Sequence, residues 1–138
     1  MAVFLDTNIL VYAEDADSAG KQAIAAALVA ECYLKGEAVI STQVMMEYYN
    51  VAVRKLKLEP TFAAQRLRLF AKFRTVSTTP QLVLAATDLH RLHSLSFWDA
   101  MILQAAITSG CDTLYSEDFN AGQIVSGVKI VNPFKLTN

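Results

Sequence analysis

Cysteine, proline and glycine are scarce in this chain of 138 residues, which contains two, three and five of them. Cys32 and Cys111 lie far apart and form no CxxC pair, so the sequence predicts neither a disulfide framework nor a cysteine-based zinc site. Free thiols are typical of a reducing compartment, and we expect a cytoplasmic protein. Hydrophobic residues make up 54% of the chain and charged residues 18%, which excludes an intrinsically disordered chain.

Long apolar runs are also missing. The longest stretch without Asp, Glu, Lys or Arg covers residues 75–87 and contains Pro80, so it is too short for a transmembrane helix. The N-terminus has no basic region, and Asp6 interrupts its first apolar run, which argues against a secretory signal. The motifs GxGxxG, GxxxxGK[ST] and GxSxG are absent as well, so the usual signals of dinucleotide binding, nucleotide binding and serine hydrolysis are missing.

Charge is distributed unevenly although the net charge is only −1. Residues 1–53 carry two basic and seven acidic side chains, whereas residues 54–74 carry seven basic and one acidic. A basic block beside an acidic remainder can attract a polyanion such as nucleic acid, or it can be an ordinary solvated helical face. Charge alone leaves both interpretations open. The candidate RNA contacts in this block are Arg54, Lys55, Arg66 and Arg68.

Short apolar segments alternate with segments of helical spacing along the whole chain. The predicted strands are residues 3–5, 38–40, 75–77, 113–115 and 128–131. The predicted helices are residues 18–35, 42–56, 60–74, 80–93 and 96–109. For the first helix, the spacing predicts an inward face of Ile24, Ala27, Leu28 and Cys32. This alternation predicts one α/β domain over residues 1–138, with a central, mainly parallel five-stranded sheet flanked by helices.

Acidic residues directly follow two of the predicted strands. Asp6 follows the first strand, and Glu117 and Asp118 follow the strand at 113–115. The carboxyl ends of strands in an open α/β sheet border the crevice where ligands bind. Asp6 could instead cap a following helix, and the Glu117–Asp118 pair could be a solvated turn.

Two further acids lie on predicted helices. Glu47 shares the apolar stripe of Val44 and Val51, where a charge is costly unless it is paired or bound to a cation. A satisfied ion pair or a position at the margin of the stripe would also explain it. Asp99 stands three residues after Ser96, which matches a capping box, so Asp99 could simply complete a helix start.

No single alternative explains all of these acids together. Four neighbouring carboxylates would repel one another and raise their pKa values, and divalent cations remove that conflict. A site made only of oxygen ligands suits Mg²⁺ or Mn²⁺. The sequence therefore predicts a metal site built by acids from four separate segments.

Four segments resemble, in order, the acidic motifs of PIN-domain proteins, and in particular of the VapC-type toxins of toxin–antitoxin pairs. These segments are residues 4–12, 41–47, 97–100 and 115–119. The resemblance covers nearly the whole chain. It implies Asp6, Glu47, Asp99 and Asp118 as catalytic and metal-binding residues, with Thr7, Asn8, Ser116 and Glu117 as supporting residues.

The same resemblance implies an activity and partners. VapC-type members are endoribonucleases that need Mg²⁺ or Mn²⁺ and are inhibited by a cognate antitoxin protein, and many members form homodimers. The alternative is a PIN-like module that binds RNA or a protein without cleaving anything. An aspartyl-phosphate phosphatase is disfavoured, because that chemistry uses a second acid two residues after the first, where this chain has Asn8.

Overall fold

The computed structural model describes residues 1–135 as helices on both sides of a central sheet. The elements in chain order are β1 (Val3–Leu5), α1 (Thr7–Tyr12), the short 3-10 helix η1 (Ala16–Ser18), α2 (Ala19–Leu34), β2 (Ala38–Ser41), α3 (Thr42–Arg54), α4 (Pro60–Phe70), β3 (Arg74–Val76), α5 (Pro80–Leu92), α6 (Phe97–Thr108), β4 (Thr113–Tyr115), β5 (Ile124–Val125) and β6 (Val128–Val131). None of the helices in this part of the chain has the length and apolar character needed to cross a membrane.

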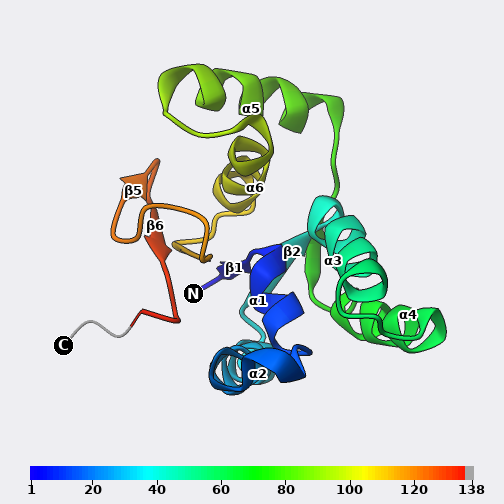
Figure 1. The fold of residues 1–138 in the computed structure, drawn as a ribbon. Helices are drawn as coiled ribbons and strands as arrows, with labels where there is room; N and C mark the ends of the chain where they lie inside the picture. Colours follow the sequence, from blue (N-terminus) through cyan, green and yellow to red (C-terminus); the bar gives the residue numbers. More distant parts are fainter. Residues whose placement is uncertain (136–138) are drawn as a thin grey trace.

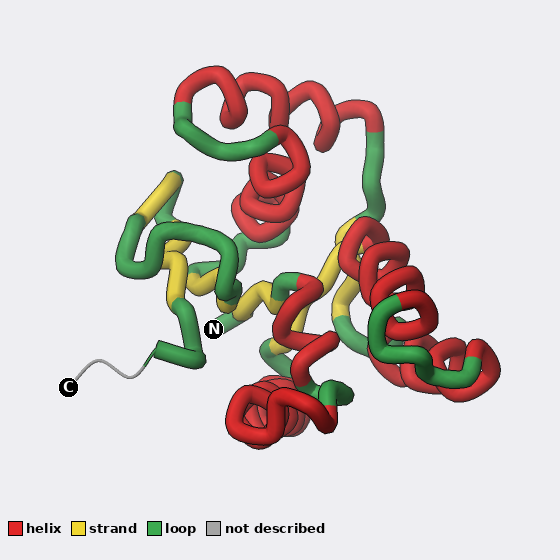
Figure 2. The backbone as a smooth tube through the Cα atoms, in the orientation of Figure 1, coloured by secondary structure: helices red, strands yellow, loops and turns green. Residues whose placement is uncertain are grey.

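The sheet has the strand order β3-β2-β1-β4-β6-β5, and every neighbouring pair is parallel except β5 and β6. Every residue of β1 and β2 is buried, as expected for strands covered on both faces. Figure 1 shows α5 and α6 on one side of the sheet and α1 and α2 on the other. In Figure 2 the strands cross the middle of the molecule between these helices. The predicted α/β class and mainly parallel sheet are confirmed.

The predicted number of five strands is wrong, because the sheet has six. The additional strand, β5, pairs antiparallel with β6 through Val125 and Val128. Ser126 and Gly127 connect the two strands with φ angles of 49° and 84°, as in a two-residue hairpin turn. A strand of two residues is too short to show an alternating pattern, so periodicity does not detect it.

The predicted inward face of α2 is only partly right, because Cys32 is buried and Leu28 packs half-buried against the core while Ala27 is exposed. Ala25, Val29 and Cys32 are buried, whereas Ile24 is 37% exposed. Apolar residues lie on nearly every side of this helix, so their spacing does not define one face. The helix ends as predicted at Gly36, whose φ is 68° and whose N–H donates to the carbonyl of Tyr33.

The most deeply buried helix is α6, which lies between α5 and the sheet and contacts both (Figure 1). Its buried residues lie on several sides of the helix and include Ala100, Met101, Ile102, Leu103, Ala105 and Ala106. Because the helix body is fixed by this packing, its first turn, which carries Asp99, is held in a defined place.

Candidate functional site

The parallel pairing of β1 with β4 brings the residues that follow these two strands together. Leu5 lies opposite Tyr115, and the Asp6 N–H donates to the Tyr115 carbonyl over 3.1 Å. Ser116 comes next after β4, and its hydroxyl donates to Asp6 Oδ2 over 2.7 Å. Residues 110 positions apart in the chain are therefore in direct contact at the carboxyl edge of the sheet.

Asp6 serves two purposes at once. Its Oδ1 accepts a hydrogen bond from the Thr7 N–H over 2.7 Å, so it caps α1, while Oδ2 is held by Ser116. The capping alternative for Asp6 is thus correct and does not compete with a place in the site. The Thr7 hydroxyl also donates to Glu47 Oε1 over 2.9 Å, which connects α1 to α3.

Asn8 and Ser116 connect the acids to the loop after β4. Asn8 Nδ2 donates to Asp118 Oδ2 over 3.0 Å, and Asn8 Oδ1 accepts from the Glu117 N–H over 3.2 Å. The Asp118 N–H donates to the Ser116 hydroxyl over 3.1 Å. Three acids and three uncharged polar side chains therefore form one hydrogen-bonded network that joins the start of α1, α3 and the loop after β4.

Asp99 reaches the same place from the start of α6. Ser96 caps this helix by accepting from the Asp99 N–H over 3.1 Å, so part of the predicted capping box is present. Gln43 Nε2 of α3 donates to the Trp98 carbonyl over 3.3 Å and ties the first turn of α6 to α3. Helix capping and a place on the cavity wall are compatible for this residue.

One cavity of about 640 Å³ joins these side chains. Asp6, Glu47, Asp99 and Asp118 all line it, from four different segments of the chain. Among the described residues that line the cavity, Lys55 is the one basic side chain.

Burial dominates the electrostatics of the site. It raises the pKa of Asp6 from 3.8 to about 7, against hydrogen bonds from Ser116 and Thr7 that lower it, while the charges of Asp118 and Glu47 raise it further. Burial likewise raises the pKa of Asp99; the hydrogen bond with Ser96 opposes this shift and the Asp118 charge adds to it.

A cation would relieve this unfavourable burial of negative charge. The ion pairs within residues 1–135 involve other carboxylates, so none neutralises Asp6, Glu47, Asp99 or Asp118. Among the described residues, no group of three or more His, Cys, Asp or Glu side chains is already spaced as the ligands of a metal ion. The donor chemistry still fits Mg²⁺ or Mn²⁺, because the set consists of oxygen atoms and carries an excess of negative charge.

Glu117 also lines the cavity, but it is engaged elsewhere. It forms an ion pair with Lys21, and the Tyr12 hydroxyl donates to its Oε1 over 2.8 Å. Burial would raise the pKa of Glu117, but these hydrogen bonds and the Lys21 charge outweigh burial and lower it. Lys21 and Tyr12 were not predicted as site residues, and with 96 positions between Lys21 and Glu117 no local pattern indicates their contact.

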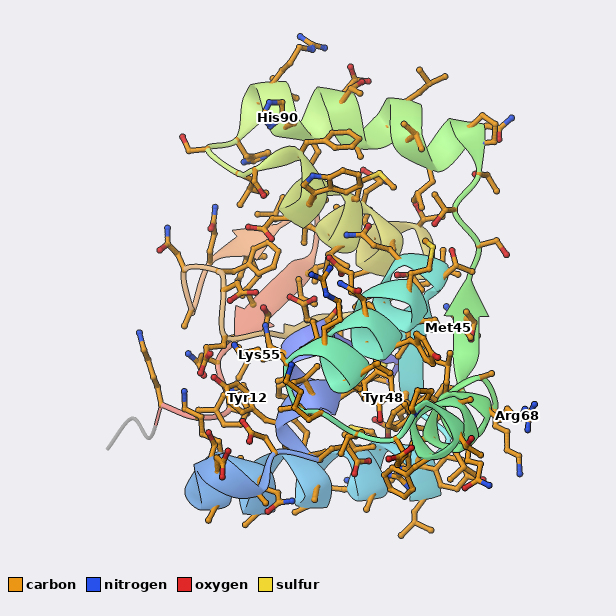
Figure 3. The ribbon with its side chains drawn as sticks, turned by 45° about the vertical axis from the view of Figure 1, so that its right-hand side comes forward. Tyr12, Met45, Tyr48, Lys55, Arg68 and His90 are labelled. Carbon is orange, nitrogen blue, oxygen red and sulfur yellow. The ribbon has the colours of Figure 1, made fainter. Side chains whose placement is uncertain are left out.

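The four candidate RNA contacts are not gathered in one place. Lys55 lines the acidic cavity, at the end of α3 nearest α1 (Figure 3). Arg66 donates to Glu14 over 2.5 Å and borders a separate apolar pocket between α2 and α4. Arg68 on α4 points outward at the right-hand edge of the view, away from Lys55 (Figure 3), and Arg54 is exposed.

Solved structures with the same fold come from toxin–antitoxin systems. A toxin–antitoxin complex from Klebsiella pneumoniae matches with a TM-score of 0.66 and 22% identity, over 99% of this chain and 100% of that one. The sarcin–ricin loop cleaving toxin VapC20 of Mycobacterium tuberculosis matches with a TM-score of 0.62 and 19% identity, over 85% of this chain and 90% of that one. VapBC2 from Rickettsia felis, bound to a DNA fragment from its promoter, matches with a TM-score of 0.60 and 20% identity, over 86% of this chain and 89% of that one.

The sequence itself matches one family model. Comparison with curated proteins finds none that matches the chain. The model of the PIN domain matches residues 3–124, which include Asp6, Glu47, Asp99 and Asp118 and both strands whose ends meet at the cavity. On this evidence, the chain belongs to the PIN-domain family.

Proposed function

We propose that this PIN domain is an endoribonuclease that depends on Mg²⁺ or Mn²⁺ and acts as the toxin of a toxin–antitoxin pair. One observation carries the proposal: four carboxylates from four segments line a single cavity, and no ion pair within residues 1–135 neutralises them. A buried acid whose pKa is raised to about 7 holds a proton about half of the time at neutral pH, and a bound cation would favour its carboxylate form.

The four acids and the polar side chains hydrogen-bonded to them have separate tasks in this proposal. Asp6, Glu47, Asp99 and Asp118 would hold the cation, which lowers the pKa of a water molecule and offsets charge on the phosphate. Thr7, Asn8 and Ser116 orient three of these carboxylates through the hydrogen bonds described above. They thereby fix the oxygen atoms before the substrate arrives.

Lys55 is the basic residue best placed for the substrate. It lines the same cavity as the four candidate metal-binding acids and forms no ion pair within residues 1–135. Its ammonium group can neutralise a phosphate next to the one being hydrolysed, which an acidic cavity alone would repel. Arg54, Arg66 and Arg68 remain proposals for more distant backbone contacts.

The class of substrate and the partners follow from the structural neighbours. VapC20 is described as cleaving the sarcin–ricin loop, which is RNA. Two of the neighbours are complexes of a toxin with an antitoxin. We therefore infer an RNA substrate and a cognate antitoxin for this chain, and we propose a homodimer only from its resemblance to VapC-type toxins. Loops and single strands suit a crevice best, because their backbone can bend into it.

Cleavage of total RNA by the purified protein, without an antitoxin, tests the activity. Discrete fragments are expected with Mg²⁺ or Mn²⁺ and none with EDTA. Asp6→Asn and Asp99→Asn should each lower the cleavage rate at least about 100-fold, since each removes a charge that holds the cation. Asp88→Asn is the matched control, because Asp88 is exposed on α5 and pairs only with Arg91.

Two outcomes would contradict the proposal. Cleavage that persists in EDTA, or in both cavity variants, would show that the acids are not responsible. A folded protein that binds RNA without ever cutting it would instead favour the binding module considered above.

A further inference from the structure

The most exposed aromatic ring of the described residues lies on the wall of the acidic cavity. Trp98 is 63% exposed, and this residue lines the cavity together with Asp99 and Lys55. Tryptophan is enriched at binding surfaces, so an exposed tryptophan beside a polar cavity is a candidate contact for a ligand of that cavity. Neither helix capping nor metal binding requires a tryptophan at this position.

The ring is held by a rigid support. The Trp98 carbonyl accepts a hydrogen bond from Gln43 on α3, and the body of α6 is packed between α5 and the sheet. Phe97, which is half-buried against the core, contacts the Trp98 ring edge-on with 5.3 Å between the ring centroids. A flat ring on a fixed backbone loses little entropy when another ring stacks on it.

Resting on the proposed endoribonuclease activity, we propose that Trp98 is a stacking platform for an RNA base next to the scissile phosphate. Trp98 directly precedes Asp99 and both residues line the cavity, so a base adjacent to a phosphate held near Asp99 can reach the ring. Lys55 and Asn50 line the same cavity and offer an ammonium and an amide group to the backbone. An aromatic ring combined with a cation is the usual way to hold single-stranded RNA.

This assignment favours RNA over a protein segment as the ligand of the ring. The cavity lining combines apolar residues (Val51, Leu56 and Ile102) with polar ones (Asn50, Lys55 and Asp99), and a nucleotide offers a base to the first kind and a phosphate to the second. Stacking also tolerates any base, so Trp98 would add affinity without dictating the sequence that is cleaved.

Trp98 is the only tryptophan of the chain, so its fluorescence reports on this ring alone. The protein used is Asp6→Asn, which prevents cleavage, and the probe is a single-stranded RNA of ten nucleotides. RNA should quench the tryptophan emission, whereas an abasic strand of the same length and charge should not. The abasic strand retains the phosphates and removes only the stacking partner.

Affinity measurements complete the test, with labelled RNA and all variants in the Asp6→Asn background. Trp98→Ala should weaken RNA binding about 5- to 100-fold, and Trp98→Phe should restore most of it. Tyr33→Ala is the control, because Tyr33 is an exposed aromatic residue on α2 outside this cavity. A circular dichroism melt of each variant verifies that it is folded.

The outcomes separate this inference from the proposed function. If RNA binds without quenching and Trp98→Ala keeps its affinity, the stacking role is overturned while the nuclease stands. If Trp98→Ala binds RNA normally but loses a co-expressed antitoxin, the ring belongs to a protein interface and the inference fails. If RNA neither binds to the Asp6→Asn protein nor is cleaved by the wild type, the proposed function fails together with the inference.

Discussion

At the scale of single residues, Asp6 shows how one side chain satisfies two demands. One carboxylate oxygen caps α1 and the other is held by Ser116, so the group stays ordered although it is buried. A buried polar group without such partners is unusual, and Tyr48 is one.

Tyr48→Phe should therefore stabilise the protein. The Tyr48 hydroxyl is buried without a hydrogen-bond partner among the described residues. Its ring packs edge-on against that of Phe70, with 4.9 Å between the ring centroids. Removing the hydroxyl keeps the ring and removes its desolvation cost, so the free energy of unfolding should rise by about 1 kcal/mol. Urea denaturation measures this, with Tyr33→Phe as the exposed control. A clear loss of stability would mean that the hydroxyl has a partner after all.

A second prediction at this scale concerns Lys21. Because its ion pair helps to lower the pKa of Glu117, Lys21→Met should raise that pKa. Carboxyl-carbon NMR titration measures the shift. Lys35→Met is the matched control, since Lys35 pairs with Glu31 at the other end of the same helix and should leave Glu117 unaffected. An unchanged pKa of Glu117 in Lys21→Met would disprove the coupling.

At the scale of elements, Gly20 within α2 and Gly36 just after its last turn have opposite effects on the stability of the helix. Gly36 follows the last turn with a φ of 68°, and its N–H and that of Glu37 close the helix on Tyr33 and Cys32. Gly20 lies inside the first turn with an ordinary helical backbone. An added Cβ would meet no atom within 4 Å at either position, so backbone conformation alone separates them.

Alanine at these two positions should therefore change stability in opposite directions. Gly36→Ala should lower the free energy of unfolding by about 1 kcal/mol, because an L-residue is strained at positive φ. Gly20→Ala should raise it by about 0.5 kcal/mol, because alanine loses less backbone entropy in a helix. Thermal or urea unfolding of both variants measures the difference. Equal effects would contradict this account of the cap.

At the scale of the whole molecule, the acidic cavity makes stability depend on pH and on cations. The pKa of Asp6 is about 7 in the folded protein and 3.8 without the fold, so between these values the folded state binds more protons than the unfolded state. The free energy of unfolding should therefore fall as the pH rises through this range, by at most about 1.4 kcal/mol per pH unit from this group. Asp99, whose pKa is also raised, contributes with the same sign.

Denaturant titrations of the metal-free protein from pH 4 to pH 8 test this prediction. Asp6→Asn should remove most of the slope. At pH 8, Mg²⁺ at 100 times its dissociation constant should stabilise the protein by about 2.7 kcal/mol, since it binds only the folded cavity. A wild-type stability that is flat across this range and indifferent to Mg²⁺ would contradict both the raised pKa and the proposed cation.

Local patterns were sufficient for much of the fold. Residues 3–5 and 38–40 were predicted as strands because every residue in them is apolar, and the strands that they form, β1 and β2, are buried inside the sheet. Gly36 was correctly predicted to end α2, because its positive φ angle is a local backbone conformation that favours glycine. The two-residue strand β5 was missed and the inward face of α2 was predicted only in part, because neither has a periodic signal strong enough to define it.

By itself, the sequence determined that the chain forms one α/β domain with acids after β1 and β4, since composition and period are local properties. Only the tertiary structure decided how those acids meet: the pairing of β1 with β4 places Ser116 on Asp6. It also separated Lys55 from Arg66 and Arg68, engaged Glu117 with Lys21, and set Trp98 on the cavity wall. These are contacts between distant segments, which depend on the packing of the whole chain and leave no trace in local spacing.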